Sequence, residues 1–480
     1  MSLASTLNTT KSIFNNTSAQ SAVVSTNIQN ASNPDYNKRS ATTSVNIYSG
    51  AVILSTERAQ NSALLKQVLN STSVDSAQQE LVSTMDQISA LLGGDSYSLS
   101  PSTYLATFRD TLTTYAETPS DITLAQSVVA AAQDVANSLN NMSDGVQSLR
   151  VEADNEIATQ VATLNSLLAE FKVANDAVIK ATATGQDPNS AIDKREALVK
   201  QISGIIGVST YVRSGNDMAL YTSAGTTLFE TVPRNVSFSA SVAFAAGGEG
   251  NGIYIDGVKV DAGDGASTTA RGSLQALLQL RDNVLPTIQD QLDETARGLI
   301  SLFAETDASG DRIAGLFTTK TGAAVDFDTA EIITGLASSI TVSSTAASSP
   351  FTLRDGNISG ESVNDDDASG FSDLLRDYLS AFDAPIDFDG AAKLGTNVTL
   401  LDYATDTVGW IEEFRSSATT ASETTGAMLV RASEAYSNNT GVNLDEELIL
   451  LLDIEQSYKA ASKLLSTIDE MLKALMAATG

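Results

Sequence analysis

The strongest constraint on the fold of this sequence is a heptad repeat of apolar residues close to its C-terminus. Two rows of residues recur every seven positions: Leu451, Tyr458, Leu465 and Leu472, and Ile454, Ala461, Ile468 and Leu475. Together they fill both inward positions of successive heptads, which is the pattern of a coiled-coil seam. The repeat therefore predicts a C-terminal helix whose apolar stripe requires a partner.

The residues just before the repeat predict where this helix begins. Asn443 belongs to the residue types that cap helix N-termini, because its side-chain oxygen accepts hydrogen bonds from the first free backbone N–H groups. Asp445, Glu446 and Glu447 follow it and place negative charge where the helix dipole favours it. We expect the C-terminal helix to begin directly after Asn443.

The N-terminus offers a candidate partner for this helix. Two heptad rows run through it: Leu3, Val24 and Ala31 on one, and Leu7, Phe14 and Ile28 on the other. The first 30 residues include 16 Ser, Thr or Asn, so a helix here is marginal unless it packs against another element. We expect the two terminal helices to pair as a coiled coil and to be disordered in the isolated monomer. A purely intramolecular coiled coil is the alternative to an assembly interface.

Charge limits the classes of partner. The chain has 58 acidic and 28 basic residues, and its net charge of −30 repels phosphate backbones and anionic lipid surfaces. We therefore expect no nucleic-acid partner and no membrane insertion. The first basic residue is Lys11 and no apolar run follows it, so the sequence predicts no cleaved signal peptide.

Composition and periodicity change along the chain and predict four domains, some of them built from more than one stretch. Helical periodicity dominates three stretches, strand-like alternation one, and Gly, Ser and acidic residues another, where 16 acids stand against 5 bases in residues 301–400. The expected domains are a terminal helical assembly domain (1–45 and 438–480), a helical rod-like domain (46–206, 270–305 and 401–437), a β-rich segment attached to it (207–269), and an outer acidic β-rich domain (306–400). The predicted fold is thus mainly α with inserted β-rich domains.

Residues for catalysis and metal binding are scarce in the sequence. It contains no Cys and no His, which excludes thiol nucleophiles, imidazole bases and the usual zinc ligands. Asn364 and the acidic run Asp365–Asp367 have the acidity of a calcium loop but lack the ligand spacing and closing Glu of an EF-hand. We therefore interpret this segment as a solvated acidic loop, with calcium binding as the alternative. We predict no catalytic residue, no cofactor and no resident metal.

Three segments of the sequence resemble one family of flagellar proteins. Asn27–Arg39, which reads NIQNASNPDYNKR, resembles the segment after the first helix of flagellar rod, hook and junction proteins, with Asp35 where Gly is usual. Gly441–Glu447, which reads GVNLDEE, and the helix after it resemble the last helix of the flagellar hook-associated protein 1 family. Asp193–Val199 is similar to a helix-to-strand junction of that family.

This resemblance implies a non-catalytic subunit of the bacterial flagellum that forms the junction between hook and filament. It implies an elongated, multi-domain axial architecture and export by the flagellar type III apparatus without a cleaved signal peptide. The implied partners are further copies of the chain in a ring, the hook protein, hook-associated protein 3 and an export chaperone at the C-terminal segment. A flagellin or another axial protein is one alternative, and an exported peptidoglycan hydrolase is another.

The predicted assembly interface lies on the two terminal helices and on the segment after the first helix, which resembles that of flagellar rod, hook and junction proteins. Its residues are apolar, apart from Tyr36 and Arg39 in the segment that resembles the family, and should gain the most from being covered by neighbouring subunits. They are Leu3, Leu7, Phe14, Val24, Ile28, Tyr36, Arg39, Leu451, Ile454, Tyr458, Leu465, Ile468, Leu472 and Leu475.

Overall fold

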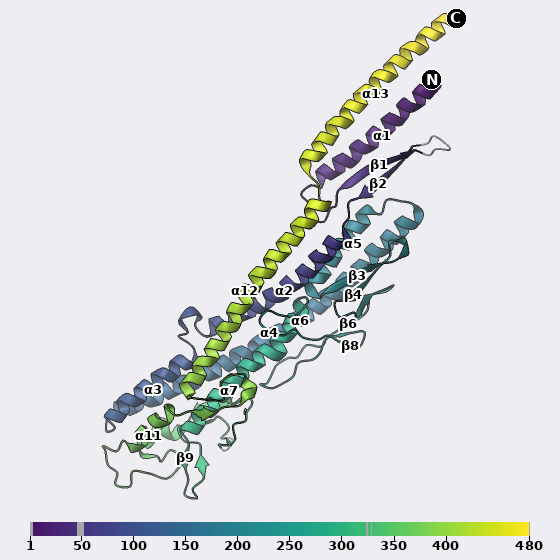
Figure 1. Ribbon diagram of the computed structural model, residues 1–480. Coiled ribbons are helices and arrows are strands. Elements are labelled where there is room, and N and C mark those ends of the chain that lie inside the picture. The colour runs from purple at the N-terminus through teal and green to yellow at the C-terminus, as the bar shows by residue number, and fades with distance from the viewer. Residues whose placement is uncertain (1–2, 46–51, 323–324, 328, 480) are drawn as a thin grey trace. The chain divides into compact units, whose positions relative to one another are not determined.

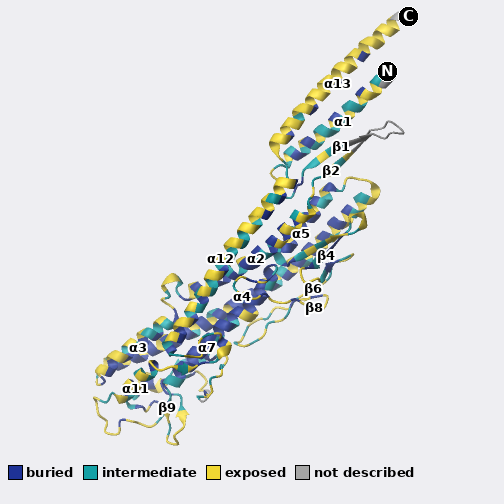
Figure 2. Cartoon of the chain, viewed as in Figure 1, coloured by how far each residue is buried: buried dark blue, intermediate teal, exposed yellow. Residues whose placement is uncertain are grey.

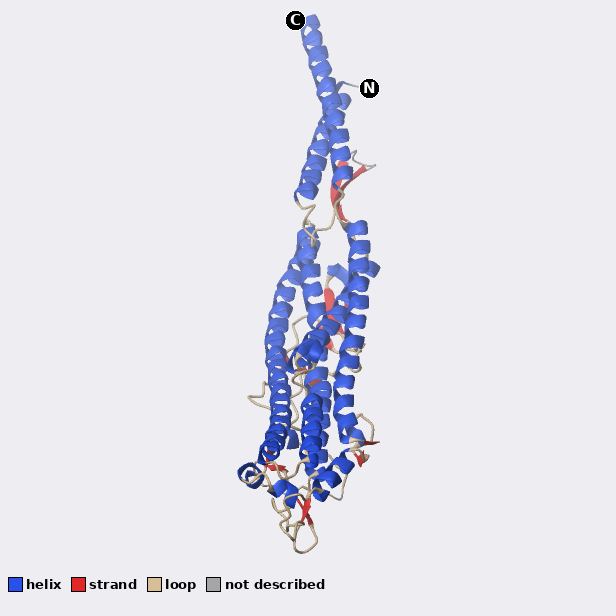
Figure 3. Ribbon diagram, turned by 90° about the vertical axis from the view of Figure 1, so that its left-hand side faces the viewer, coloured by secondary structure: helices blue, strands red, loops and turns tan. Residues whose placement is uncertain are grey.

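The computed structural model describes residues 3–45, 52–322, 325–327 and 329–479. Helices make up most of these residues and the strands are short (Figure 3), which confirms the prediction of a mainly α fold with small inserted sheets. The chain divides into two compact units. Unit 1 comprises residues 1–73, 164–235 and 425–480, and unit 2 comprises residues 74–163 and 236–424. Three long helices contribute residues to both units: α2 (Ser62–Leu91), α4 (Ile122–Thr184) and α12 (Leu400–Thr440).

Unit 1 contains both terminal helices, one further helix and two small antiparallel sheets (Figure 1). Its own elements are α1 (Leu3–Gln29), β1 (Arg39–Val45), β2 (Val52–Arg58), α5 (Asn189–Ile205), β3 (Val208–Val212), β4 (Met218–Thr222), β5 (Thr227–Phe229) and α13 (Leu444–Thr479). Strand β4 lies between β3 and β5. The core beneath this sheet includes an edge-to-face contact of Phe171 with Phe229, whose ring centroids are 4.9 Å apart.

The hairpin of β1 and β2 corrects the sequence prediction, which assigned residues from Val52 onward to helix. The two strands pair in antiparallel register from Arg39 opposite Arg58 to Val45 opposite Val52, and the turn between them lies outside the described residues. Val52, Ile53 and Thr56 on β2 are β-branched, as are Thr42, Thr43 and Val45 on β1, and such residues favour extended backbone. Their strand preference outweighs the helical spacing that the prediction relied on.

Unit 2 is built around helix α7, which is buried along nearly its whole length. Its further helices are α3 (Pro101–Glu117), α6 (Ser273–Gln279), a π-helical turn at Leu280–Val284, α7 (Leu285–Leu302), α8 (Leu336–Ser339), α9 (Ser344–Ser348), α10 (Thr352–Asp355) and α11 (Asp373–Phe382). Leu285, Ile288, Leu292 and Leu299 recur on one face of α7 and are at most 1% exposed. Helices around α7 therefore shield it from solvent on every side described.

The strands of unit 2 are all two or three residues long. They pair as β6 (Val236–Ser237), β7 (Tyr254–Ile255) and β8 (Val258–Lys259), and as the two-stranded sheets β9 (Glu305–Thr306) with β10 (Arg312–Ile313), β11 (Phe317–Thr319) with β12 (Ile340–Val342), and β13 (Ile386–Asp387) with β14 (Asn397–Val398). Short 3-10 turns at Gly94–Ser96, Ser214–Asn216 and Gly390–Ala392 complete the chain.

Residues 306–400 depart from the β-rich domain that the sequence predicts. Short helices α8 to α11 occupy more of this segment than its strands do. In α11, Leu375, Tyr378 and Phe382 are buried at spacings of three and four residues, which is helical periodicity hidden among acidic and small residues. The abundance of Gly, Ser and Asp was therefore a sign of frequent turns between short elements of both kinds.

A helix can cross a membrane only if it is long enough and sufficiently apolar. Among the described residues, no helix combines the length and apolar character that a bilayer span requires.

Candidate functional site

The candidate site is the pair of terminal helices in unit 1 together with the polar residues at its base. Helices α1 and α13 lie side by side (Figure 1). Asn27 contacts Glu447 near the start of α13, and Phe14 contacts Tyr458 further along it. Residue numbers fall along α1 as they rise along α13, so the two helices are antiparallel.

Helix α1 is polar for a helix with a packing role, and its Thr residues show how it tolerates this. The hydroxyl of Thr10 donates to the carbonyl of Thr6 at 2.9 Å, and that of Thr17 to the carbonyl of Ile13 at 2.9 Å. Because each hydroxyl is satisfied within its own helix, the methyl group remains available for packing. Thr10, Thr17 and Val24 are all buried and stand seven residues apart.

Helix α13 begins as the sequence predicts. The side-chain oxygen of Asn443 accepts hydrogen bonds from the backbone N–H groups of Asp445 at 3.0 Å and Glu446 at 3.4 Å. Asn443 therefore caps the helix, and three acidic residues occupy its first turn.

Gly441, which precedes the cap, has a steric reason to be glycine. A Cβ at this position would lie 2.6 Å from the carbonyl oxygen of Ser437, closer than real side chains approach. The backbone N–H of Gly441 donates to that same carbonyl at 2.7 Å, which ends α12. The segment 441–447 is thus a tight connection between two helices.

The two heptad rows of α13 lie in different environments. Ile454, Ala461 and Ile468 are buried, at 6%, 1% and 4% exposure. Tyr458, Leu465 and Leu472 are 51%, 40% and 38% exposed, and Leu475 is 62% exposed. Figure 2 shows α13 as exposed along most of its length. The row of Ile454 therefore packs inside unit 1 as far as Ile468, whereas its last member, Leu475, and the row of Tyr458 remain open to solvent.

The remaining residues of the predicted interface range from buried to exposed. Val24 and Tyr36 are buried, Phe14, Ile28, Arg39 and Leu451 are half-buried, and Leu7 is exposed. Leu3 lies in α1, but its side chain is outside the described residues. Edge-to-face packing joins Phe14 and Tyr458, whose ring centroids are 5.0 Å apart.

The sequence prediction left out further exposed apolar residues of α13. They are Leu444, Leu448, Ile449, Leu450, Leu452, Leu464, Met471 and Met476. A strict heptad reading ignores positions beside the seam, although apolar residues at those positions broaden the stripe. The exposed apolar surface of α13 is consequently wider than a two-row seam.

Asn27 is the centre of a buried polar junction at the base of the helix pair. Its side-chain nitrogen donates to the Arg39 carbonyl at 2.8 Å and to Glu447 Oε2 at 3.0 Å. Its side-chain oxygen accepts from the Tyr36 hydroxyl at 2.7 Å and from the Arg39 backbone N–H at 3.0 Å. All four hydrogen-bonding positions of this amide are occupied, as burial of a polar group requires.

A second part of the junction connects the β1–β2 hairpin to α5. Arg58 donates from Nε to Asp193 Oδ1 at 2.6 Å and from Nη1 to Glu196 Oε1 at 3.1 Å. Arg39 donates from Nη2 to Asp193 Oδ2 at 3.1 Å. The carboxylates of α5 thus hold both strands of the hairpin at the end where Arg39 pairs with Arg58.

Tyr436 of α12 joins the same network. Its hydroxyl donates to Glu196 Oε2 at 3.0 Å and accepts from the side-chain nitrogen of Asn37 at 2.8 Å. Burial raises the pKa of Tyr436 above its usual value, and nearby Glu196 raises it further. Burial likewise raises the pKa of Tyr36. Both phenols therefore remain protonated donors at neutral pH.

This network unites the three sequence segments that resemble one family. Asn27, Tyr36 and Arg39 come from the first segment, Asp193 and Glu196 from the helix α5 segment, and Glu447 from the segment that opens α13. The residues that make those segments recognisable are therefore largely residues of one buried junction.

Charge at the exposed edge of the junction also links the ends of the chain. Lys38 Nζ lies 2.9 Å from Glu446 Oε2 and 3.4 Å from Glu447 Oε1. Hydrogen bonding to Glu446 is the main reason that the pKa of Lys38 is raised. The backbone N–H of Lys38 donates to the carbonyl of Thr440 at 2.7 Å.

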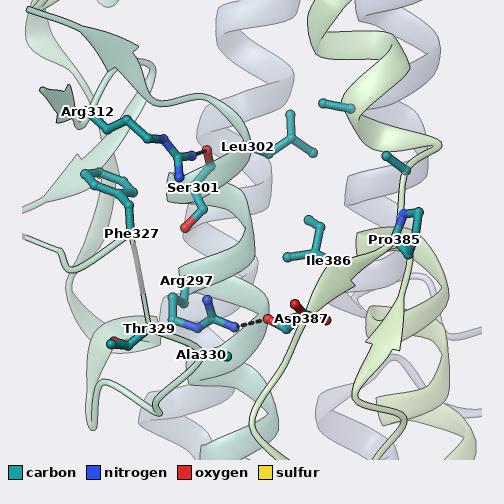
Figure 4. Close-up of a pocket in the computed structure, with 12 residues that line it drawn as sticks. Arg297, Ser301, Leu302, Arg312, Phe327, Thr329, Ala330, Pro385, Ile386 and Asp387 are labelled. Atoms are coloured by element: carbon teal, nitrogen blue, oxygen red, sulfur yellow. Dashed lines mark hydrogen bonds between the residues drawn. The ribbon is translucent and has the colours of Figure 1, made fainter. Parts of the chain in front are cut away.

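Unit 2 contains a cavity of about 430 Å³, large enough for a small ligand (Figure 4). Arg297 and Arg312 line it with Phe327. Arg297 donates to both carboxylate oxygens of Glu294 and to the Asp387 carbonyl, at 2.6–2.8 Å. Arg312 donates to the Ser301 carbonyl at 2.7 Å and lies over the Phe327 ring. These guanidinium groups already have protein partners, so the cavity offers little charge to a ligand.

The acidic loop that could have bound a cation has an internal structural role at Asn364. Its side-chain nitrogen donates to Asp355 Oδ1 at 2.7 Å and to the Ala368 carbonyl at 3.1 Å. Asp365, Asp366 and Asp367 point into solvent. Within the described part of the chain, no group of three or more acidic residues is arranged to hold a metal ion.

Comparison with known proteins gives matches along most of the chain. Residues 85–323 match the family model of the flagellar hook-associated protein FlgK helical domain, and residues 433–478 that of the flagellar basal body rod FlgEFG protein C-terminal region. The second match includes most of α13, and the first includes α5.

Curated relatives carry one name. Flagellar hook-associated protein 1 of Bacillus subtilis is 23% identical over 374 residues, which cover 72% of this chain and 70% of the relative. Its counterpart in Escherichia coli is 22% identical over 457 residues, which cover 82% and 83%. A solved structure, the flagellar hook junction protein FlgK from Burkholderia pseudomallei, matches at a TM-score of 0.44 and 20% identity, over 53% of this chain and 46% of that one.

Proposed function

The chain belongs to the family of flagellar hook-associated protein 1, and we propose that it serves as a non-catalytic structural subunit that assembles at the hook–filament junction through its terminal helices. The flagellum is the location that its relatives' names imply. Assembly through the helix ends is the part of the proposal that this chain's own residues support.

The exposed row of α13 is the observation that carries this proposal. Tyr458, Leu465 and Leu472 lie on a helix whose other heptad row is already buried from Ile454 to Ile468. Full burial of a large apolar side chain contributes about 1.5–3 kcal/mol, and a neighbour that covers the 38–51% of these side chains still exposed would add part of that at each position. Exposed apolar surface of this extent is typical of an interaction site. The polar junction would hold this stripe at a fixed place in unit 1.

The proposed partners follow from the family and from this surface. Copies of the chain would form a ring, with the hook protein on one side and hook-associated protein 3 on the other. An export chaperone would cover the C-terminal segment before secretion, when the stripe has no other partner. Export would proceed through the flagellar type III apparatus without removal of a signal peptide.

Two other functions compete with this one. A flagellin or another axial protein would polymerise into long filaments or occupy a different part of the axis. An exported peptidoglycan hydrolase would require a catalytic carboxylate, and an assay of the purified protein on cell-wall material would detect its activity. We propose that the chain has no such activity, because the buried carboxylates at the junction already serve as hydrogen-bond acceptors.

The test is deletion of the gene in the source bacterium, followed by electron microscopy of its flagella and assay of the medium for filament protein. We expect hooks without filaments and unpolymerised filament protein in the medium. Normal filaments in the deletion strain would contradict the proposal, and long filaments made of this chain would favour a flagellin.

Complementation with paired variants then tests the interface itself. Leu465→Asp should fail to restore filaments, because a carboxylate would be buried between subunits. Ser466→Asp should restore them, because Ser466 lies on the polar face of α13 with Lys459, Lys463 and Glu470. Equal restoration by both variants would show that the exposed row does not contact a neighbour.

A further inference from the structure

Glu447 occupies a position where a coiled coil normally has an apolar residue. It stands seven residues before Ile454 and therefore begins the row that continues through Ala461 and Ile468. All of these residues are buried, and Glu447 is only 1% exposed. A carboxylate at an inward position is costly unless it has a partner.

Asn27 is the partner of Glu447 on the opposite helix, and Lys38 Nζ lies 3.4 Å from the other carboxylate oxygen, Oε1. The side-chain nitrogen of Asn27 donates to Glu447 Oε2 at 3.0 Å, and Asn27 is 1% exposed. The remaining bonds of the amide, to Tyr36 and to the backbone of Arg39, fix its orientation. The donor that reaches Glu447 is consequently oriented by contacts that do not involve α13.

The rest of the seam gives little information about register. Thr10 and Thr17 satisfy their hydroxyls within α1, so they present only methyl groups to α13. The apolar rows of α13 repeat every seven residues, and a shift of one heptad would replace Tyr458 by Leu465 opposite Phe14. Such a shift is about 10 Å of travel along the helix axis and preserves the apolar pattern.

We propose that the Asn27–Glu447 hydrogen bond is the register pair of the terminal helices, selecting one of several apolar alignments of α13 on α1. In the shifted alignment Ile454 would face Asn27, and the amide would lose its charged acceptor. A single buried polar residue sets register in this way in other coiled coils, at a cost in stability. This inference concerns the chain's own helix pair and holds whether or not the hook–filament assignment is correct.

Site-specific cross-linking of the full-length chain can measure the register directly, because the natural chain contains no Cys. Phe14→Cys with Tyr458→Cys reports the observed register, and Phe14→Cys with Leu465→Cys reports the shifted one. A short bis-maleimide would be applied to each pair. In the otherwise natural chain we expect the first pair to cross-link at least about tenfold more than the second.

The decisive variant is Asn27→Leu combined with Glu447→Leu, which leaves the seam apolar throughout. We expect the two cross-links to become comparable in yield, because the buried polar pair that favours one alignment is then absent. Glu447→Gln, which keeps an acceptor for the Asn27 amide, should retain the native preference. The matched control is Glu446→Gln, which weakens the exposed ion pair with Lys38 at the same junction and should change neither yield.

Three outcomes would overturn the proposal. Persistence of the native preference in the double Leu variant would show that chain connectivity or the apolar residues set the register. Loss of both cross-links would show that the polar pair sustains the helix pair rather than aligning it. Equal cross-linking in the otherwise natural chain would show that no single register exists.

Discussion

Arg58 and Glu196 are joined by two nearly parallel hydrogen bonds, from Nη1 to Oε1 at 3.1 Å and from Nη2 to Oε2 at 2.5 Å. The Arg58 side chain is 3% exposed, and it also pairs with Asp193. Burial alone would lower the pKa of Arg58, but the carboxylates of Glu196 and Asp193 outweigh it and raise the pKa. The hairpin is thus fastened to α5 by charges that have little access to water.

Replacing Arg58 by Met should destabilise unit 1 strongly. The substitution leaves two carboxylates with reduced compensation in a buried site, and such changes cost about 3–5 kcal/mol. Urea unfolding followed by circular dichroism should show a lower midpoint for Arg58→Met. Lys172→Met is the matched control in unit 1, because Lys172 and Asp176 form an exposed pair whose loss should cost at most about 1 kcal/mol. Equal effects of the two substitutions would contradict the prediction.

Local patterns in the sequence predicted the features of this protein that depend on neighbouring residues. The heptad rows indicated α13, and Asn443 was identified as its cap from residue type alone. Short alternating runs separated by Gly and Asn in residues 207–269 indicated the strands that the structure contains there. The bonds that cap α13 lie within three residues of Asn443, and each of these strands pairs with a strand next to it in chain order.

The junction could not be predicted from local patterns, because its contacts connect distant parts of the chain. Asn27 and Glu447 are 420 residues apart, and Tyr436 and Glu196 are 240 residues apart. Glu447 looked like an ordinary acidic residue of a first helical turn, and its place on the row of Ile454 was the missed signal. Short elements such as α8, with four residues, also have too few positions to show a periodicity.

Gly250→Ala should destabilise unit 2 through a buried ion pair. A Cβ on Gly250 would overlap the guanidinium of Arg281, which pairs with Asp154 where both side chains are fully buried. Displacing Arg281 weakens this pair, and we expect a loss of about 2–4 kcal/mol. Thermal unfolding monitored by calorimetry would measure it.

Gly409→Ala is the control for this substitution. Gly409 lies within α12, and a Cβ there would meet no atom within 4 Å. Alanine is favoured over glycine inside a helix by about 1 kcal/mol, so this variant should be slightly more stable than the natural chain. Destabilisation by Gly409→Ala would indicate that its backbone freedom matters for another reason.

Phe303→Ala should remove the centre of an aromatic cluster in unit 2. Its ring centroid lies 4.7 Å from that of Tyr378, 5.3 Å from Phe108 and 5.4 Å from Phe317. Phe303 is fully buried, and truncation at such a site costs about 3–5 kcal/mol. Near-ultraviolet circular dichroism should lose intensity, and the melting temperature of unit 2 should fall. Tyr211→Ala, at a side chain that is 63% exposed, should change stability by about 0.5 kcal/mol or less.

Asp293 gives unit 2 a pH dependence of defined sign. Burial raises the pKa of its carboxyl from the usual 3.8 to about 6, although N–H groups of Ala337, Gly335 and Gln289 donate to it and oppose the rise. Between these two values the folded chain binds more protons than the unfolded chain, so this group's contribution to stability is complete below about pH 4 and is lost as the pH rises to about 6. The full change amounts to about 3 kcal/mol.

Comparison with Asp293→Asn isolates this contribution from that of other acidic residues. Asparagine has nearly the same shape and does not titrate, so the stability of the natural chain relative to the variant should fall between pH 4 and pH 6.5 and then level off. Urea unfolding at half-unit pH intervals would measure the difference. A constant difference would mean that Asp293 is ionised throughout this range and that its three hydrogen bonds compensate its burial in full.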